Sequence, residues 1–132
     1  MPGAEAPFGF QLAIVLTQSF EQLPSASKIA HAASLFLVAL AVVLLMTPAA
    51  YHRIVYAGED SQDIHRVGSA LVTTATIPLA LGLVGDVYVV ITKIVGTPTA
   101  GLIAGSLALV LLIGLWYAYP LVAAYLQNRT AR

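Results

Sequence analysis

The chain alternates between long apolar stretches and short polar segments. Asp, Glu, Lys and Arg are all absent from residues 29–52, 67–85 and 94–128. A bilayer core about 30 Å thick needs about 20 consecutive apolar residues in a helix that crosses it. These stretches therefore predict three membrane-spanning helices. The expected helices cover residues 28–52, 64–95 and 99–127.

A shorter apolar segment precedes them at residues 8–23. At 1.5 Å per residue it rises about 24 Å, so it either crosses a thinned bilayer or lies partly in the interface. No Lys or Arg occurs before Phe10, which disfavours a secretory signal peptide. The expected fold is an all-α transmembrane four-helix bundle, made of three spans plus this short N-terminal helix. The bundle forms a single domain over residues 8–128, between a disordered lead at 1–7 and a basic tail at 129–132.

The composition agrees with a membrane location. Hydrophobic residues make up 59% of the chain and charged residues 9%, whereas an ordinary soluble domain carries roughly 25% charged residues. The formal net charge of zero gives no electrostatic basis for binding nucleic acid. Because the chain has no cysteine, disulfides, thiolate metal sites and thiol nucleophiles are excluded. We expect neither a metal nor a cofactor.

The distribution of basic residues predicts the orientation, because Lys and Arg accumulate in cytoplasmic loops. The loop before residue 67 and the C-terminal tail carry four arginines, namely Arg53, Arg66, Arg129 and Arg132. The opposite side holds Lys28 and Lys93. We therefore expect the arginine side to be the cytoplasmic face of a bacterial inner membrane, with four crossings and both termini in the cytoplasm.

Pro78 interrupts the predicted helix at 64–95. Proline lacks an N–H, so the carbonyl of Thr74 loses its helical partner, which is costly in lipid. Thr76 and Tyr117 lie at similar depths, roughly 13 Å from the cytoplasmic ends of their helices. We expect the Tyr117 hydroxyl to face this break. The alternative is an aromatic filler whose hydroxyl is satisfied within its own helix.

Small residues indicate where the helices pack, because helices in lipid associate by close approach and hydrogen bonding. Gly101 and Gly105 form a G-x-x-x-G motif, and Gly82 and Gly85 lie on the preceding helix. The helix at 28–52 offers Ala30, Ala32 and Ala33. We expect tight contacts in the outer half of the bundle, within one chain rather than between two.

A first polar cluster is expected at the outer surface and contains Glu21, His31 and Asp86. Asp86 lies about 28 Å along its helix from Val67, close to the outer boundary. An ionisable residue within a span is costly and is treated as functional, which makes a metal or proton site one hypothesis. A solvated rim in which Asp86 pairs with His31 or Lys93 is the favoured interpretation.

A second polar cluster flanks the cytoplasmic loop. It consists of Tyr51, His52, Arg53, Asp63, His65 and Arg66. Together with loop carboxylates these residues suggest a divalent cation site, but no H-x-x-x-H or H-E-x-x-H spacing occurs. The favoured interpretation is structural: Tyr51 anchors at the interface, Arg53 faces lipid phosphate, and Asp60 or Ser61 caps the next helix.

The run MTPAAYHRIVYAGEDSQDIHRVGSALV, with GFQLAIVLTQSFEQLP before it and WYAYPLVAAYLQNR near the end, resembles a family of small four-span bacterial membrane proteins of unknown function. That family has a Pro-x-Ala-Tyr-His-Arg signature, matched here by Pro48, Ala50, Tyr51, His52 and Arg53. The resemblance extends from Gly9 to about Arg129, and the chain departs from it in its less basic, shorter lead. Some relatives carry an automatic label of sodium:proton antiporter. The resemblance implies a membrane fold and no defined activity.

Two function classes remain open. Transporters place their sites near the midplane, where this chain offers Ser34, Tyr117 and three threonines but no acid or histidine. Enzyme signatures such as G-x-S-x-G or a Gly-rich phosphate loop are absent. We therefore expect an accessory or scaffold subunit that packs with other membrane subunits or with itself, contacts lipid, and performs no catalysis. Proton or cation transport by an oligomer is the alternative.

Overall fold

The computed structural model describes residues 2–55 and 62–130. Within these residues the chain is helical and contains no strand, which confirms the all-α prediction. The elements are α1 (Pro2–Val15), α2 (Gln18–Glu21), α3 (Ser25–Val55), α4 (Gln62–Val95), α5 (Pro98–Ile113), the π-helical turn η1 (Gly114–Ala118) and α6 (Tyr119–Thr130).

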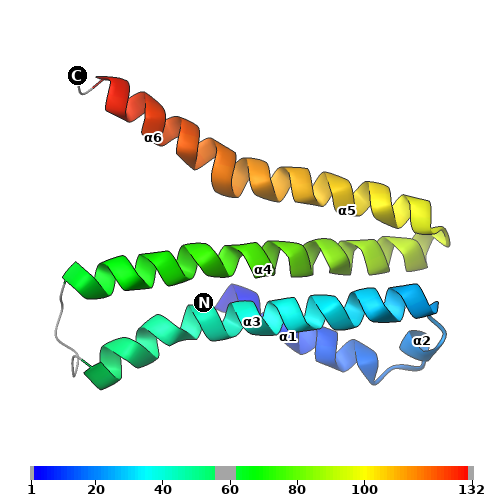
Figure 1. The fold of residues 1–132 in the computed structure, drawn as a ribbon. Coiled ribbons are helices and arrows are strands. Elements are labelled where there is room, and N and C mark those ends of the chain that lie inside the picture. Colours follow the sequence, from blue (N-terminus) through cyan, green and yellow to red (C-terminus); the bar gives the residue numbers. More distant parts are fainter. Residues whose placement is uncertain (1, 56–61, 131–132) are drawn as a thin grey trace.

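Three of the described helices are long and apolar enough to cross a bilayer: α3, α4 and the continuous helix formed by α5, η1 and α6. They contain 31, 34 and 33 residues. At 1.5 Å per residue each exceeds the hydrocarbon thickness of about 30 Å. Antiparallel α3 and α4 lie side by side, α5 follows the far side of α4, and α1 lies against α3 (Figure 1). These lengths indicate a membrane protein.

The interface between α3 and α4, here called the seam, contains buried residues that recur every three or four positions. On α3 the buried positions are Ser27, His31, Ser34, Val38 and Ala41. On α4 they include Ala75, Pro78, Gly82, Val89 and Thr92. This spacing is the heptad pattern of helices that cross at a shallow angle. Ala32 and Ala33, predicted to make tight contacts, lie outside the repeat and are exposed.

The N-terminal segment differs from the expected disordered lead at 1–7 and single helix at 8–23. Helix α1 begins at Pro2, a residue suited to the first helical position, and Ala4 is buried. The chain leaves the helix at Leu16 and Thr17 and forms the short α2. The fourteen residues of α1 rise about 21 Å, and α1 starts beside the middle of α3 (Figure 1). Helix α1 therefore covers one half of the bundle.

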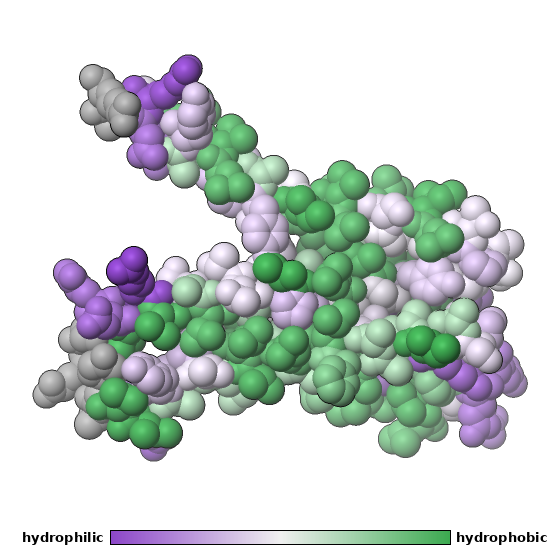
Figure 2. Space-filling model, in the orientation of Figure 1, coloured by the Kyte–Doolittle hydropathy of each residue, from purple (hydrophilic) through white to green (hydrophobic). Residues whose placement is uncertain are grey.

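The third span bends where η1 interrupts it. A π-helical turn inserts an extra residue into the hydrogen-bond ladder and is a common cause of kinks. Beyond η1, α6 diverges from α4, and the space-filling view shows an open wedge between α6 and the rest of the molecule (Figures 1 and 2). Charged side chains gather at the two ends of the molecule, which leaves an apolar band between them (Figure 2).

Burial is confined to one half of the bundle. Every buried side chain among the described residues belongs to 4–41 or 75–105. This half contains α1, the outer part of the α3–α4 seam and the start of α5. The half that contains α6, the end of α3 and the start of α4 has no fully buried residue in the described chain. The core is therefore complete on the side of Lys28 and Lys93, and the arginine-bearing side is open.

Candidate functional site

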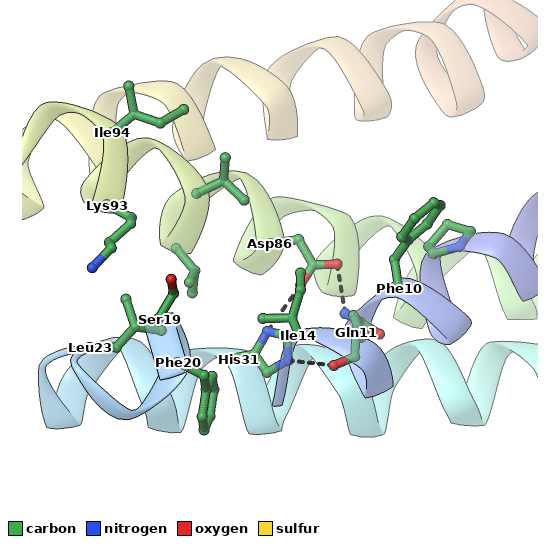
Figure 3. Close-up of a pocket in the computed structure, with 13 residues that line it drawn as sticks. Phe10, Gln11, Ile14, Ser19, Phe20, Leu23, His31, Asp86, Lys93 and Ile94 are labelled. Carbon is green, nitrogen blue, oxygen red and sulfur yellow. Dashed lines mark hydrogen bonds and ion pairs between the residues drawn. The ribbon is translucent and has the colours of Figure 1, made fainter. Parts of the chain in front are cut away.

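A polar group links three helices inside the packed half. Gln11 of α1 donates from Nε2 to Asp86 Oδ2 of α4 at 2.6 Å. The ring of His31 on α3 contacts the same glutamine, with Nε2 3.1 Å from the Gln11 carbonyl oxygen. His31 Nδ1 lies 3.9 Å from Asp86 Oδ1. Figure 3 shows the three side chains converging at the base of a cavity.

The backbone carbonyl of Gln11 fixes the tautomer of His31. A carbonyl oxygen only accepts hydrogen bonds, so His31 Nε2 must carry the proton and donate it. In the neutral ring, Nδ1 is then an acceptor that faces the Asp86 carboxylate. Phe20 of α2 holds the ring from the other side in an edge-to-face contact with a centroid distance of 5.4 Å. The imidazole is therefore held in one orientation by three helices.

The group is more buried than the expected solvated rim. His31 and Gln11 are each 3% exposed, and the Asp86 side chain is 23% exposed. The reason is α1, which lies over the outer part of α3 and α4 and excludes solvent from this level. The expected His31–Asp86 pair forms, but Glu21 does not join it. Glu21 lies at the end of α2, where its backbone carbonyl accepts a hydrogen bond from Lys28 Nζ at 2.8 Å.

The polar group lines a cavity of about 360 Å³ between α1, α2, α3 and α4. The rest of the lining is mainly apolar and comes from α1, α2 and α4, with Lys93 at the rim. Two buried oxygens of the group, Gln11 Oε1 and Asp86 Oδ1, have no hydrogen-bond partner among the described residues. Unpaired buried polar atoms are costly and call for an explanation.

The predicted cytoplasmic cluster is split between two helix ends. Tyr51, His52 and Arg53 lie in the last turns of α3, and Asp63, His65 and Arg66 lie in the first turns of α4. Glu59 and the predicted caps Asp60 and Ser61 lie outside the described residues. In the part of the chain that the structure describes, no three His, Asp or Glu side chains are placed to hold a metal ion.

The proline break is bridged from the third span. Tyr117 of η1 and Thr76 of α4 are joined by a hydrogen bond between their hydroxyl groups. Thr76 also donates to the carbonyl of Thr73 at 2.6 Å, so the Tyr117 hydroxyl is the donor in this pair. Thr74 donates to the carbonyl of Ala70 at 2.8 Å. Tyr117 thus faces the break and is the last polar contact before α6 diverges.

The four glycines singled out from the sequence lie at contacts within the chain. A Cβ at Gly82 would come within 2.6 Å of Val38 Cγ2, and one at Gly85 would overlap Ser34 Oγ. A Cβ at Gly101 would come within 2.7 Å of the Tyr88 carbonyl oxygen. Gly105 has more room, with its nearest neighbour at 3.5 Å. Three of the four positions therefore require glycine for the observed approach of the helices.

Gln11 is the residue of the site that the sequence analysis misses. It is the one strongly polar side chain in the run FGFQLAIVL at 8–16. An isolated amide in an apolar helix indicates a buried hydrogen-bond partner, because polar side chains in lipid bond across helices. That signal was available from the sequence, but it named no partner.

The comparisons with known proteins assign a family and no activity. No curated protein and no solved structure matches the chain. A family of unknown function, DUF6328, matches residues 2–120, which include every helix that contributes to the polar group and the proline break. The chain belongs to this family of unknown function, DUF6328.

Proposed function

We propose that this protein is an accessory or scaffold subunit of a membrane assembly, that it has no catalytic activity of its own, and that it assembles by packing α6 against a second copy. The observation that carries the proposal is the confinement of burial to residues 4–41 and 75–105. The remaining half presents the end of α3, the start of α4 and α6, and none of its described residues is fully buried. A partner helix in the wedge would complete that half.

The faces around the wedge suit a helix as occupant. Helices in lipid associate through small residues and hydroxyls that permit close approach. Helix α6 carries Ala123 and Ala124, and the first half of α4 carries the exposed residues Ala70, Thr73 and Thr74. These positions favour a packed helix over a disordered acyl chain.

A second copy of the chain is the occupant that we favour, because membrane insertion gives every copy the same orientation. Helix α6 of the second copy then enters the wedge of the first copy, antiparallel to its α4 and at the same depth. Helix α6 of the first copy enters the wedge of the second in the same way, as in a two-fold interface. Measured from the Tyr117–Thr76 contact, Arg129 lies about 18 Å along α6 and Asp63 about 20 Å along α4. The exchange therefore brings opposite charges to the same level.

The proposal also specifies the surroundings. The arginine-bearing ends face the cytoplasm of a bacterial cell, because basic residues are retained on that side. Lipid covers the outward faces of the spans, and Arg53 and Arg129 lie at the level of lipid phosphates. Nucleic acid is not a partner of a chain with zero formal net charge.

Coexpression of two differently tagged copies tests the assembly. After mild detergent extraction, capture of one tag retrieves the other copy. Ala123→Phe on α6 should reduce this recovery by about tenfold or more, because a bulky side chain prevents close approach. Ala32→Phe, on the exposed face of α3, should leave it unchanged. Recovery of a different membrane protein in place of the second copy would overturn the choice of occupant, and a lone monomer would overturn the scaffold proposal.

Proton or cation transport is the second candidate, and the observation that favours it is the buried His31–Asp86 pair inside a span. Against it, the seam towards the cytoplasm contains Val38, Ala41, Ala75 and Pro78, all buried and apolar. A path for ions would have to form between copies. The test is the flux of protons or cations into proteoliposomes. Transport requires a flux that falls in Asp86→Asn, whereas the scaffold proposal requires no flux above that of empty liposomes.

A further inference from the structure

The cavity beneath α1 combines an apolar wall with a polar base. At about 360 Å³ it lies within the range of small-molecule pockets, which are apolar and have a few convergent polar groups. The lining residues Phe10 and Ile94 are 71% and 72% exposed, and Figure 3 places them at opposite ends of the group of lining side chains. In a bilayer these exposed residues face acyl chains. A ligand can therefore enter sideways from the outer leaflet.

Buried acceptors lie beside the cavity. Gln11 Oε1 and Asp86 Oδ1 have no partner in the described chain, and Gln11 is 3% exposed. His31 Nδ1 is a third acceptor in the neutral ring, because Nε2 carries the proton. Its 3.9 Å distance from Asp86 Oδ1 is too long for a direct hydrogen bond. The base therefore holds three acceptors, and one of them belongs to a carboxylate.

We propose that this cavity binds an amphiphile with a primary ammonium head and an apolar body. A primary ammonium offers three N–H donors and a positive charge, which matches the two unpaired oxygens and the histidine nitrogen. Charge-assisted hydrogen bonds to a carboxylate are the strongest that such a head can make, more so where water is excluded. The apolar body lies along the exposed wall formed by Ile14 and Val90.

Two sources supply this chemistry: an ethanolamine phospholipid of the outer leaflet, or a free lipophilic amine. They differ in the phosphate, which only the phospholipid carries and which would lie near Lys93 at the rim. The ammonium group and its contacts at the base are common to both.

Octylamine is the probe for the free amine. Purified protein in a neutral detergent is titrated with octylamine by calorimetry, and octanol and octyltrimethylammonium serve as ligands that lack the ammonium N–H groups. Saturable binding of octylamine alone is expected. Asp86→Asn should weaken it by about tenfold or more. Asp63→Asn, the same change at an exposed carboxylate on the same helix, should not affect it.

Val90→Trp provides a second variant that leaves the polar base intact. Val90 lines the cavity and is 47% exposed, so an indole at this position should occupy part of the cavity. Octylamine binding should fall in this variant while its thermal unfolding midpoint is retained. Octylamine binding that is equal in the native protein, Asp86→Asn and Val90→Trp would overturn the proposal.

Nanodiscs distinguish the sources. Native mass spectrometry of protein from discs that contain phosphatidylethanolamine and phosphatidylcholine is compared with that of Asp86→Asn. Selective retention of phosphatidylethanolamine by the native protein assigns the site to the lipid, and octylamine binding without such retention assigns it to a free amine. Equal retention of both lipids, together with the absence of octylamine binding, would contradict the assignment to amines.

Discussion

Gly85 of α4 faces Ser34 of α3 so closely that a Cβ at position 85 would overlap the serine hydroxyl. Ser34 is fully buried, and its Cβ would also lie 3.3 Å from a Cβ at position 85. The approach of the two helices at this level is therefore set by the absence of a side chain at Gly85. It also fixes the position of the adjacent Asp86 relative to His31.

Gly85→Ala should accordingly weaken the α3–α4 seam. Overpacking of this kind destabilises by about 1–3 kcal/mol, measurable as the unfolding free energy in mixed micelles. Gly114→Ala is the matched control. Gly114 is helical with open space around it, so alanine there should be neutral or stabilising by up to about 1 kcal/mol. If the two variants are equally stable, the close contact at Gly85 does not exist.

Tyr117→Phe removes the hydroxyl that joins the third span to Thr76. Hydrogen bonds between membrane helices average about 0.6 kcal/mol, so we expect a loss of that order. This contact lies directly before α6. In Tyr117→Phe the distribution of distances between spin labels on α6 and α4, measured by electron paramagnetic resonance, should therefore broaden. Tyr119→Phe, at a position 72% exposed, should leave the distribution unchanged. A double-mutant cycle with Thr76→Val that shows no coupling would contradict the contact.

Gln11→Met tests how α1 is held. Methionine preserves the length of the side chain but removes the donor to Asp86, and a hydrogen bond to a charged group contributes about 1.5–3 kcal/mol. We expect faster hydrogen exchange throughout α1 and little change in α5. Gln18→Met, at an exposed position of α2, is the control. Unchanged protection of α1 in Gln11→Met would show that α1 is held by other contacts.

The spans were predictable because the bilayer imposes a length. Two apolar stretches lie between charged residues, one from Lys28 to Arg53 and one from Arg66 to Lys93. In lipid their backbone hydrogen bonds can be satisfied only in helices, and α3 and α4 include both stretches. Proline did not end α4, because an apolar span cannot leave its backbone unpaired. The same reasoning failed for residues 1–23, where the short segment folds as two helices rather than one.

The site was only half predictable. Asp86 and His31 were identified because titratable groups in apolar helices are conspicuous, but their burial depends on α1, whose position no local pattern encodes. The heptad pattern of α3 can be recognised in the sequence if small polar residues are counted as interface positions. It consists of Ser27, His31, Ser34, Val38 and Ala41. The divergence of α6 was not predicted, although Pro120 directly follows η1 and proline is a common cause of helix kinks.

Disulfide cross-linking in membranes tests the central claim most directly, since the native chain has no cysteine. Ala70 on α4 and Ala123 on α6 each lie about 9 Å from the Tyr117–Thr76 contact. Coexpressed Ala70→Cys and Ala123→Cys chains should form a cross-linked dimer on oxidation. Leu107→Cys, at an exposed position of α5, should form none with Ala123→Cys. A chain carrying both Ala70→Cys and Ala123→Cys that closes only within itself, with no cross-link between chains, would contradict the account.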